Sequence, residues 1–157
     1  MEKSFDYRGS IILGMHDAIV SLTGLIAGLG FAFSSRDVII LSCIISSITA
    51  SLSMGAANYL AVKATNRAHA LHAALFTAGA YMATCILLIL PFLVFKNLMV
   101  AMAAVFVMVV FIIYAFNLFF YGKNRFYKHF YEMLIICTVV SIIAFAFGQG
   151  AKYFLNY

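Results

Sequence analysis

The feature that most constrains this chain is the spacing of its charged residues, which fall in short clusters separated by long apolar stretches. Only 10% of its 157 residues are charged and 66% are apolar, whereas about a quarter of the residues in a soluble domain carry charge. A helix needs about 20 apolar residues to cross a bilayer, and the stretches have about that length. The sequence therefore predicts an all-α integral membrane protein and argues against a soluble globular domain.

Five such stretches predict five transmembrane helices, at about residues 11–33, 38–62, 70–95, 98–121 and 133–154. They lack the alternating pattern of outer-membrane barrel strands. Because the connecting segments are short and contain no low-complexity stretch, residues 1–157 are expected to form a single transmembrane domain. The first stretch carries Asp17, which is not typical of a cleaved signal peptide, so we expect it to remain as a helix.

Lys and Arg are divided unevenly between the two sides of the predicted bundle. The N-terminus and the second and fourth connections carry Lys3, Arg8, Lys63, Arg67, Lys123, Arg125 and Lys128, and the opposite side carries Arg36, Lys96 and Lys152. The positive-inside rule then predicts a cytosolic N-terminus and a C-terminus outside the cell or in a lumen. Since these cations lie at the ends of apolar runs, a lipid bilayer is the expected partner and nucleic acid is not. The compact connections and the lack of a targeting segment favour a prokaryotic inner (plasma) membrane.

The first two predicted helices are rich in small residues. Gly24 and Gly28 form a GxxxG pair, and a stripe of small residues follows the second helix at Ser42, Ser46, Thr49, Ser53 and Ala57. Such stripes let helix backbones approach closely in lipid, so plain helix packing is one interpretation of them. The three cysteines, Cys43, Cys85 and Cys137, lie inside apolar stretches without metal-site spacing and are expected to be buried free thiols.

Asp17 is the most informative single residue, because a carboxylate inside a spanning helix is costly and normally faces a partner or a watery path. Ser21, Gly24 and Gly28 share its helix face and would continue that path. The alternative is that Asp17 caps the helix N-terminus or reaches the membrane interface.

Two residues of the second helix could join Asp17 at a metal site. Counted at helical rise from the cytosolic side, Met54 lies at about the same depth as Asp17, and Asn58 follows one turn nearer the cytosol. Carboxylate, thioether and amide ligands suit a divalent transition ion, although a single Met is more often a packing residue. His69 and His72 could bind a metal on entry, but two ligands alone more often indicate interfacial histidines.

The sequence around these residues resembles the vacuolar iron transporter family. The stretch from Gly14 to Gly28 is similar to the family's Asn-Asp-Gly-Leu-Val-Ser motif in the first helix. Leu52-Ser53-Met54-Gly55-Ala56-Ala57-Asn58-Tyr59 is similar to its Ser-Met-small-small-Gly-Glu-Tyr motif in the second. Weaker similarity covers the other helices, including Pro91 and Gly148.

The resemblance implies a homodimer that exports ferrous iron, and often manganese, from the cytosol in exchange for protons through a path between the protomers. Asp17 and Met54 then line that path, and two copies of each supply four ligands at a two-fold axis. The metal is the transported ion, and no cofactor is expected.

This chain also departs from the family pattern. It has His16-Asp17-Ala18 in place of Asn-Asp-Gly and Asn58 in place of the motif glutamate, and residues 63–71 leave no room for the glutamate-rich cytosolic segment of plant and fungal members. Loss of one carboxylate per protomer keeps a second hypothesis open, in which the chain is a membrane scaffold or interaction protein without transport. An enzyme is not expected, because the sequence pairs no nucleophile with a base.

Overall fold

A computed structural model describes residues 6–32 and 35–154, with the side chains of residues 121–126 left out of the description. These residues form α1 (Arg8–Ala32), α2 (Arg36–Thr65), a 3-10 turn η1 (Arg67–His69), α3 (Ala70–Val94) and α4 (Leu98–Phe154). The described part of the chain contains no strand, so the predicted all-α class is confirmed.

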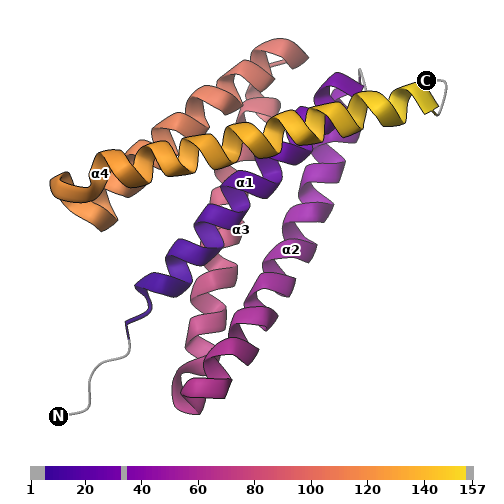
Figure 1. Cartoon of the computed structure of the whole chain (residues 1–157). Helices are drawn as coiled ribbons and strands as arrows, with labels where there is room; N and C mark the ends of the chain where they lie inside the picture. The colour runs from indigo at the N-terminus through magenta and orange to yellow at the C-terminus, as the bar shows by residue number, and fades with distance from the viewer. Residues whose placement is uncertain (1–5, 33–34, 155–157) are drawn as a thin grey trace.

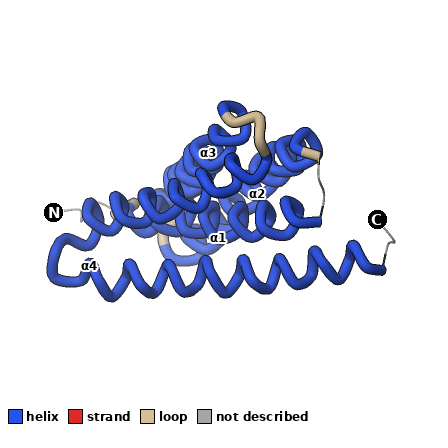
Figure 2. The backbone as a smooth tube through the Cα atoms, turned by 90° about the horizontal axis from the view of Figure 1, so that it is seen from above, coloured by secondary structure: helices blue, strands red, loops and turns tan. Residues whose placement is uncertain are grey.

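The helix α4 supplies two of the five membrane-length spans. Its arms are Leu98–Phe120 and Tyr127–Phe154, and the chain reverses direction between them (Figures 1 and 2). The rings of Tyr114 and Phe130 lie 6.5 Å apart, whereas 16 residues of straight helix would separate them by about 24 Å. The first and second arms therefore form a hairpin, and the five predicted spans are all present.

The five spans are arranged as two hairpins with α1 between them. α2 packs along α3, and α1 contacts both α3 and α4; Figure 1 shows the second arm of α4 crossing over α1. The hydrophobic core lies where these elements meet and includes Ile19, Ile26, Tyr81, Phe92 and Val105. Cys43, Cys85 and Cys137 are buried free thiols, as predicted.

Glycines set the closest helix contacts. A Cβ on Gly14 would overlap the carbonyl oxygen of Thr77 in α3, and a Cβ on Gly148 would overlap the carbonyl oxygen of Gly28. A Cβ on Gly55 would lie 3.0 Å from the Cβ of Ala78. At Gly14 and Gly148 the backbones approach to distances that only Gly permits, as expected for helices packed in lipid.

Charged and aromatic residues extend the helices beyond the apolar stretches. α1 and α2 begin at Arg8 and Arg36, a few residues before the predicted starts. The predicted starts lie at the first apolar residue, which leaves out the polar first turn of each helix, although the Arg at each start is a good helix former. The segment between Tyr121 and Met133, predicted as a connection, is helical. Its aromatic and basic residues, with a single Gly and no Pro, oppose helix formation only weakly.

Candidate transport path and metal site

Asp17 lies well inside α1, as the tenth residue counting from Arg8. It is partly buried and lines an open depression of about 510 Å³ together with His16 and Val20 of α1 and Met133 of α4. This position excludes an N-capping role, because the N-cap precedes the first helical residue. The carboxylate instead faces an open depression between α1 and the second arm of α4.

One turn further on, Ser21 joins α1 to α3. Its hydroxyl is 2.7 Å from the hydroxyl of Tyr81, a residue only 1% exposed. Since Ser21 follows Asp17 by four residues on α1, the carboxylate and the Ser21 hydroxyl share one face of that helix. Sequence reasoning missed Tyr81, because no spacing pattern links it to a residue on a distant helix.

The three predicted path residues lie together in a second cavity. Ser21, Gly24 and Gly28 line a space of about 560 Å³ that is completed by Ser46 of α2 and Ala144 of α4. At its wall, a Cβ on Gly24 would lie 3.1 Å from the Val140 side chain. The same glycines thus serve helix packing and leave a pocket beside the packed contact, so the two interpretations of the stripe are compatible.

Asn58 is part of a buried hydrogen-bond network at the junction of three helices. Its side-chain nitrogen donates to Thr77 Oγ1 over 2.6 Å, to Ser10 Oγ over 3.0 Å and to the Ala73 carbonyl over 3.2 Å. Thr77 Oγ1 is in turn 3.0 Å from the Ser10 carbonyl. The nitrogen of this amide therefore holds α1, α2 and α3 in register at their common end.

Met54 is partly buried and packs against the hydrophobic core. Ser10 and Asn58 mark one level of the bundle, since they are hydrogen-bonded. From that level, Asp17 lies about 10 Å along α1 and Met54 about 6 Å along α2. Asp17 and Met54 thus differ in depth by about one helical turn. Within the single chain Asp17 lines the depression between α1 and α4, whereas Met54 packs against the hydrophobic core.

The small-residue stripe of α2 faces outward. Ser42, Ser46, Thr49 and Ser53 line a shallow depression of about 560 Å³ with Ile45 and Ala50. Ser46 also lines the cavity of Ser21, Gly24 and Gly28. The outward stripe and the path cavity therefore form one continuous surface of a single chain.

His69 and His72 gather around Tyr7 at the end of the bundle where α3 begins. The hydroxyl of Tyr7 is 2.7 Å from His69 Nδ1, and its ring centroid is 6.2 Å from that of His72. Among the described residues, no three His, Cys, Asp or Glu side chains are close enough to hold a metal ion. These histidines attach the start of the chain to α3, and a metal-entry role for them stays a prediction.

The fold defines a multi-pass integral membrane protein, with five apolar helices long enough to span a bilayer. Residues 9–70 match the model of the VIT family. This match confirms the predicted resemblance to vacuolar iron transporters over α1, α2 and the start of α3. The match covers less than half of the chain, and the family suggests membrane transport of metal ions in general. No curated relative matches the chain.

Proposed function

We propose that this protein exports a divalent transition metal, ferrous iron with manganese as a second ion, from the cytosol by proton antiport. The observation that carries the proposal is Asp17, a partly buried carboxylate inside a spanning helix that lines an open depression. Such a group is costly in a membrane and marks an ion path. The family match over the same helix supports metal as the ion.

Asp17 and Met54 are the proposed ligands. A carboxylate oxygen and a thioether sulfur together select a borderline transition ion over calcium or sodium. Since the amide nitrogen of Asn58 bonds to Ser10, Thr77 and Ala73, Asn58 would contribute to the ion only through its oxygen. Its main role in transport is to hold α2 at a fixed height relative to α1.

A homodimer would complete the site. The outward stripe of Ser42, Ser46, Thr49 and Ser53 is the kind of surface through which membrane helices associate, and it continues into the Ser21, Gly24 and Gly28 cavity. Association about a two-fold axis on this face would bring two such cavities together. The family resemblance implies that two copies of Asp17 and Met54 supply four ligands, and since Asp17 lines a separate depression between α1 and α4 in the single chain, this arrangement also requires α1 and α4 to shift on association.

Release of the ion follows from protonation of Asp17. A carboxylate oxygen that binds a proton loses the charge that holds the metal, so one proton per carboxylate entering from the far side displaces the ion. The glycines at 24 and 28 permit helices to shift against one another during this exchange, since neither has a side chain that interlocks with the Val140 and Ala144 region of α4.

The test is uptake of ferrous iron, manganese, zinc and cobalt by proteoliposomes under an imposed pH gradient. Native protein is compared with Asp17→Asn and Met54→Ala, each shown by size exclusion to be folded. We expect flux of iron and manganese that depends on the gradient and is lost in Asp17→Asn. Equal flux in native and Asp17→Asn protein would refute the proposed path.

The second candidate is a membrane scaffold of the same fold without transport. One observation favours it. Asn58 stands at the family's glutamate position, and its side chain makes hydrogen bonds that hold helices together. Absence of flux for all four ions, from a folded dimer, would support this reading.

A further inference from the structure

The cavity beside Gly24 and Gly28, here called the α1–α4 groove, is long and mostly apolar. On α1 its lining runs from Ser21 to Ala32, and on the second arm of α4 from Val140 to Lys152. At helical rise these two stretches are about 17 and 18 Å long. One leaflet supplies half of a hydrocarbon core that is about 30 Å thick, so the groove has about the length of one leaflet.

The groove is open to the surroundings of the helices. Ser21, Phe147 and Ala151 line it, and all three are exposed. The Ser21 hydroxyl is already 2.7 Å from that of Tyr81, so it needs no polar ligand in the groove. Because these spans lie in hydrocarbon and an unfilled space forfeits dispersion contacts, the molecule that enters from this side is an acyl chain.

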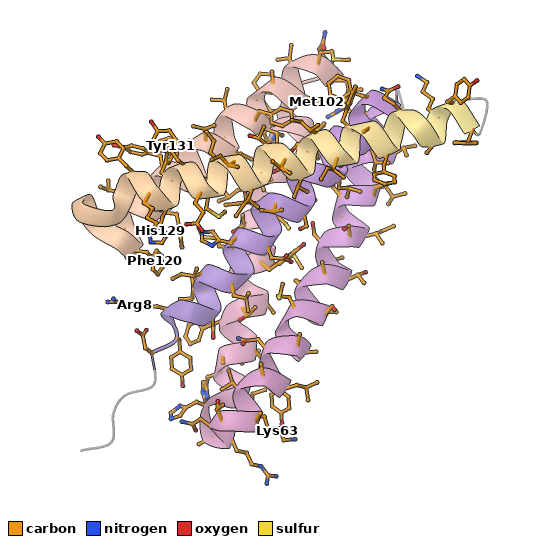
Figure 3. All side chains as sticks on the ribbon, in the orientation of Figure 1. Arg8, Lys63, Met102, Phe120, His129 and Tyr131 are labelled. Carbon is orange, nitrogen blue, oxygen red and sulfur yellow. The ribbon has the colours of Figure 1, made fainter. Side chains whose placement is uncertain are left out.

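Lys152 gives the groove a charged end. It lies in the last turn of α4, is half-buried and lines the groove, with its apolar stem along the wall and its ammonium free to reach the headgroups. Among the residues that the structure describes, no Asp or Glu forms an ion pair with it. Figure 3 shows Arg8 and Lys63 at the other end of the bundle from the end of α4, so the cation belongs to one leaflet.

We propose that the α1–α4 groove binds an acyl chain of an anionic phospholipid from the leaflet in which α4 ends, with the lipid phosphate at Lys152. The acyl chain gains little by leaving the bilayer, because lipid tails are as apolar as the groove. Selectivity therefore arises at the headgroup. The attraction of one basic side chain for anionic lipid corresponds to about a fivefold preference over a lipid without net charge.

Lipid binding in the groove goes beyond the proposed function and does not depend on transport. Only its consequence for flux rests on that function. Ser21, Gly24 and Gly28 are the proposed path residues, and they line the same groove, so an acyl chain beside them and a passing ion exclude one another. A bound lipid therefore keeps this part of the path closed until the lipid is displaced.

The experiment is native mass spectrometry of the full chain in detergent, titrated without metal with palmitoyl-oleoyl phosphatidylglycerol or palmitoyl-oleoyl phosphatidylcholine. The two lipids have the same acyl chains and differ in headgroup charge. The spectra give the number of lipids retained and the number of protein copies in each complex. We expect one phosphatidylglycerol per protomer, bound about fivefold more tightly than phosphatidylcholine.

Two pairs of variants test the two parts of the site. Lys152→Gln should lose the preference for phosphatidylglycerol, whereas Lys96→Gln, which alters an exposed cation outside the groove, should keep it. Ser46→Leu places a larger side chain in the groove and should lose retention of both lipids. Ser53→Leu makes the same change on the same stripe of α2 but outside the groove, and should retain lipid as the native chain does.

A native preference for phosphatidylglycerol in Lys152→Gln would overturn the proposal. Equal lipid retention in Ser46→Leu and Ser53→Leu would also overturn it, because the lipid would then bind elsewhere on the helices. A native dimer that retains no lipid would have the same effect, since a second copy of the chain would then cover the groove. No metal and no gradient enter these measurements, so failure of the lipid site and failure of transport are distinguishable.

Discussion

Asn58 of α2 and Thr77 of α3 are joined by a hydrogen bond of 2.6 Å that lies in the buried interior of the bundle. This bond occurs at the position where the family motif has a glutamate. A carboxylate there would face the carbonyl oxygen of Ala73, which now accepts a hydrogen bond from Asn58, and two acceptors repel. The change from glutamate to asparagine is therefore matched by the neighbouring groups of this chain.

Asn58→Ala should destabilise the protein markedly. The substitution leaves Ser10 Oγ and Thr77 Oγ1 without their shared donor, and a buried polar group without a partner costs about 1–3 kcal/mol. The measurement is the free energy of unfolding in detergent. Asn66→Ala, at the C-terminal end of α2 without a side-chain capping bond, is the control, and equal stability of the two variants would contradict the network.

Gly148→Ala should disrupt the crossing of α1 and α4. Its new methyl would overlap the carbonyl oxygen of Gly28, and overpacking of this kind costs about 1–3 kcal/mol. Gly150→Ala is the matched control two residues along, where nothing lies within 4 Å of the new atom. Since Ala is favoured over Gly in a helix by up to about 1 kcal/mol, the control should melt at or above the native temperature. A native-like melting temperature for Gly148→Ala would count against the close crossing.

Ser21 and Tyr81 should show a coupling in a double-mutant cycle. Ser21→Ala and Tyr81→Phe each remove the 2.7 Å hydrogen bond between their hydroxyls, so the double variant should lose less than the sum of the two. Hydrogen bonds between membrane helices contribute about 0.6 kcal/mol on average, and a coupling of about that size or more is expected here. Strictly additive losses would show that the two hydroxyls do not interact.

Arg36→Gln should weaken the attachment of α2 to the end of α3. The Arg36 guanidinium donates to the carbonyl of Phe92 from Nε over 2.7 Å and to that of Leu93 over 3.4 Å, which caps two carbonyls of the last turn of α3. Hydrogen bonds to charged groups contribute about 1.5–3 kcal/mol. The melting temperature of Arg36→Gln should therefore lie well below that of the control Lys96→Gln, which alters an exposed cation at the same end of α3. Coincident melting curves of the two variants would argue against the cap.

The helices could be predicted from sequence because the membrane imposes a local rule. Each span must satisfy its backbone groups internally and present about 20 apolar residues, so the number and type of elements follow from windows of sequence. The reversal within α4 was placed correctly between the fourth and fifth spans. The helical state of residues 122–132 was not predicted, since clusters of charged residues suggest a connection between helices but do not oppose helix formation.

The site could be predicted only along single helices. Ser21, Gly24 and Gly28 share a face by periodicity, and they line one cavity. The partners on other helices gave no local signal: Tyr81 meets Ser21 across 60 positions, and Thr77 meets Asn58 across 19.

The central claim, that Asp17 carries a metal ion across the membrane, is tested most directly by one paired comparison. Ferrous iron flux and lumenal pH are recorded together in proteoliposomes that contain native protein, Asp17→Asn or Asp37→Asn, the last altering an exposed carboxylate in the first turn of α2. We predict that native and Asp37→Asn protein move iron and protons in opposite directions, while Asp17→Asn moves neither. Iron flux in Asp17→Asn equal to that of Asp37→Asn would contradict the claim.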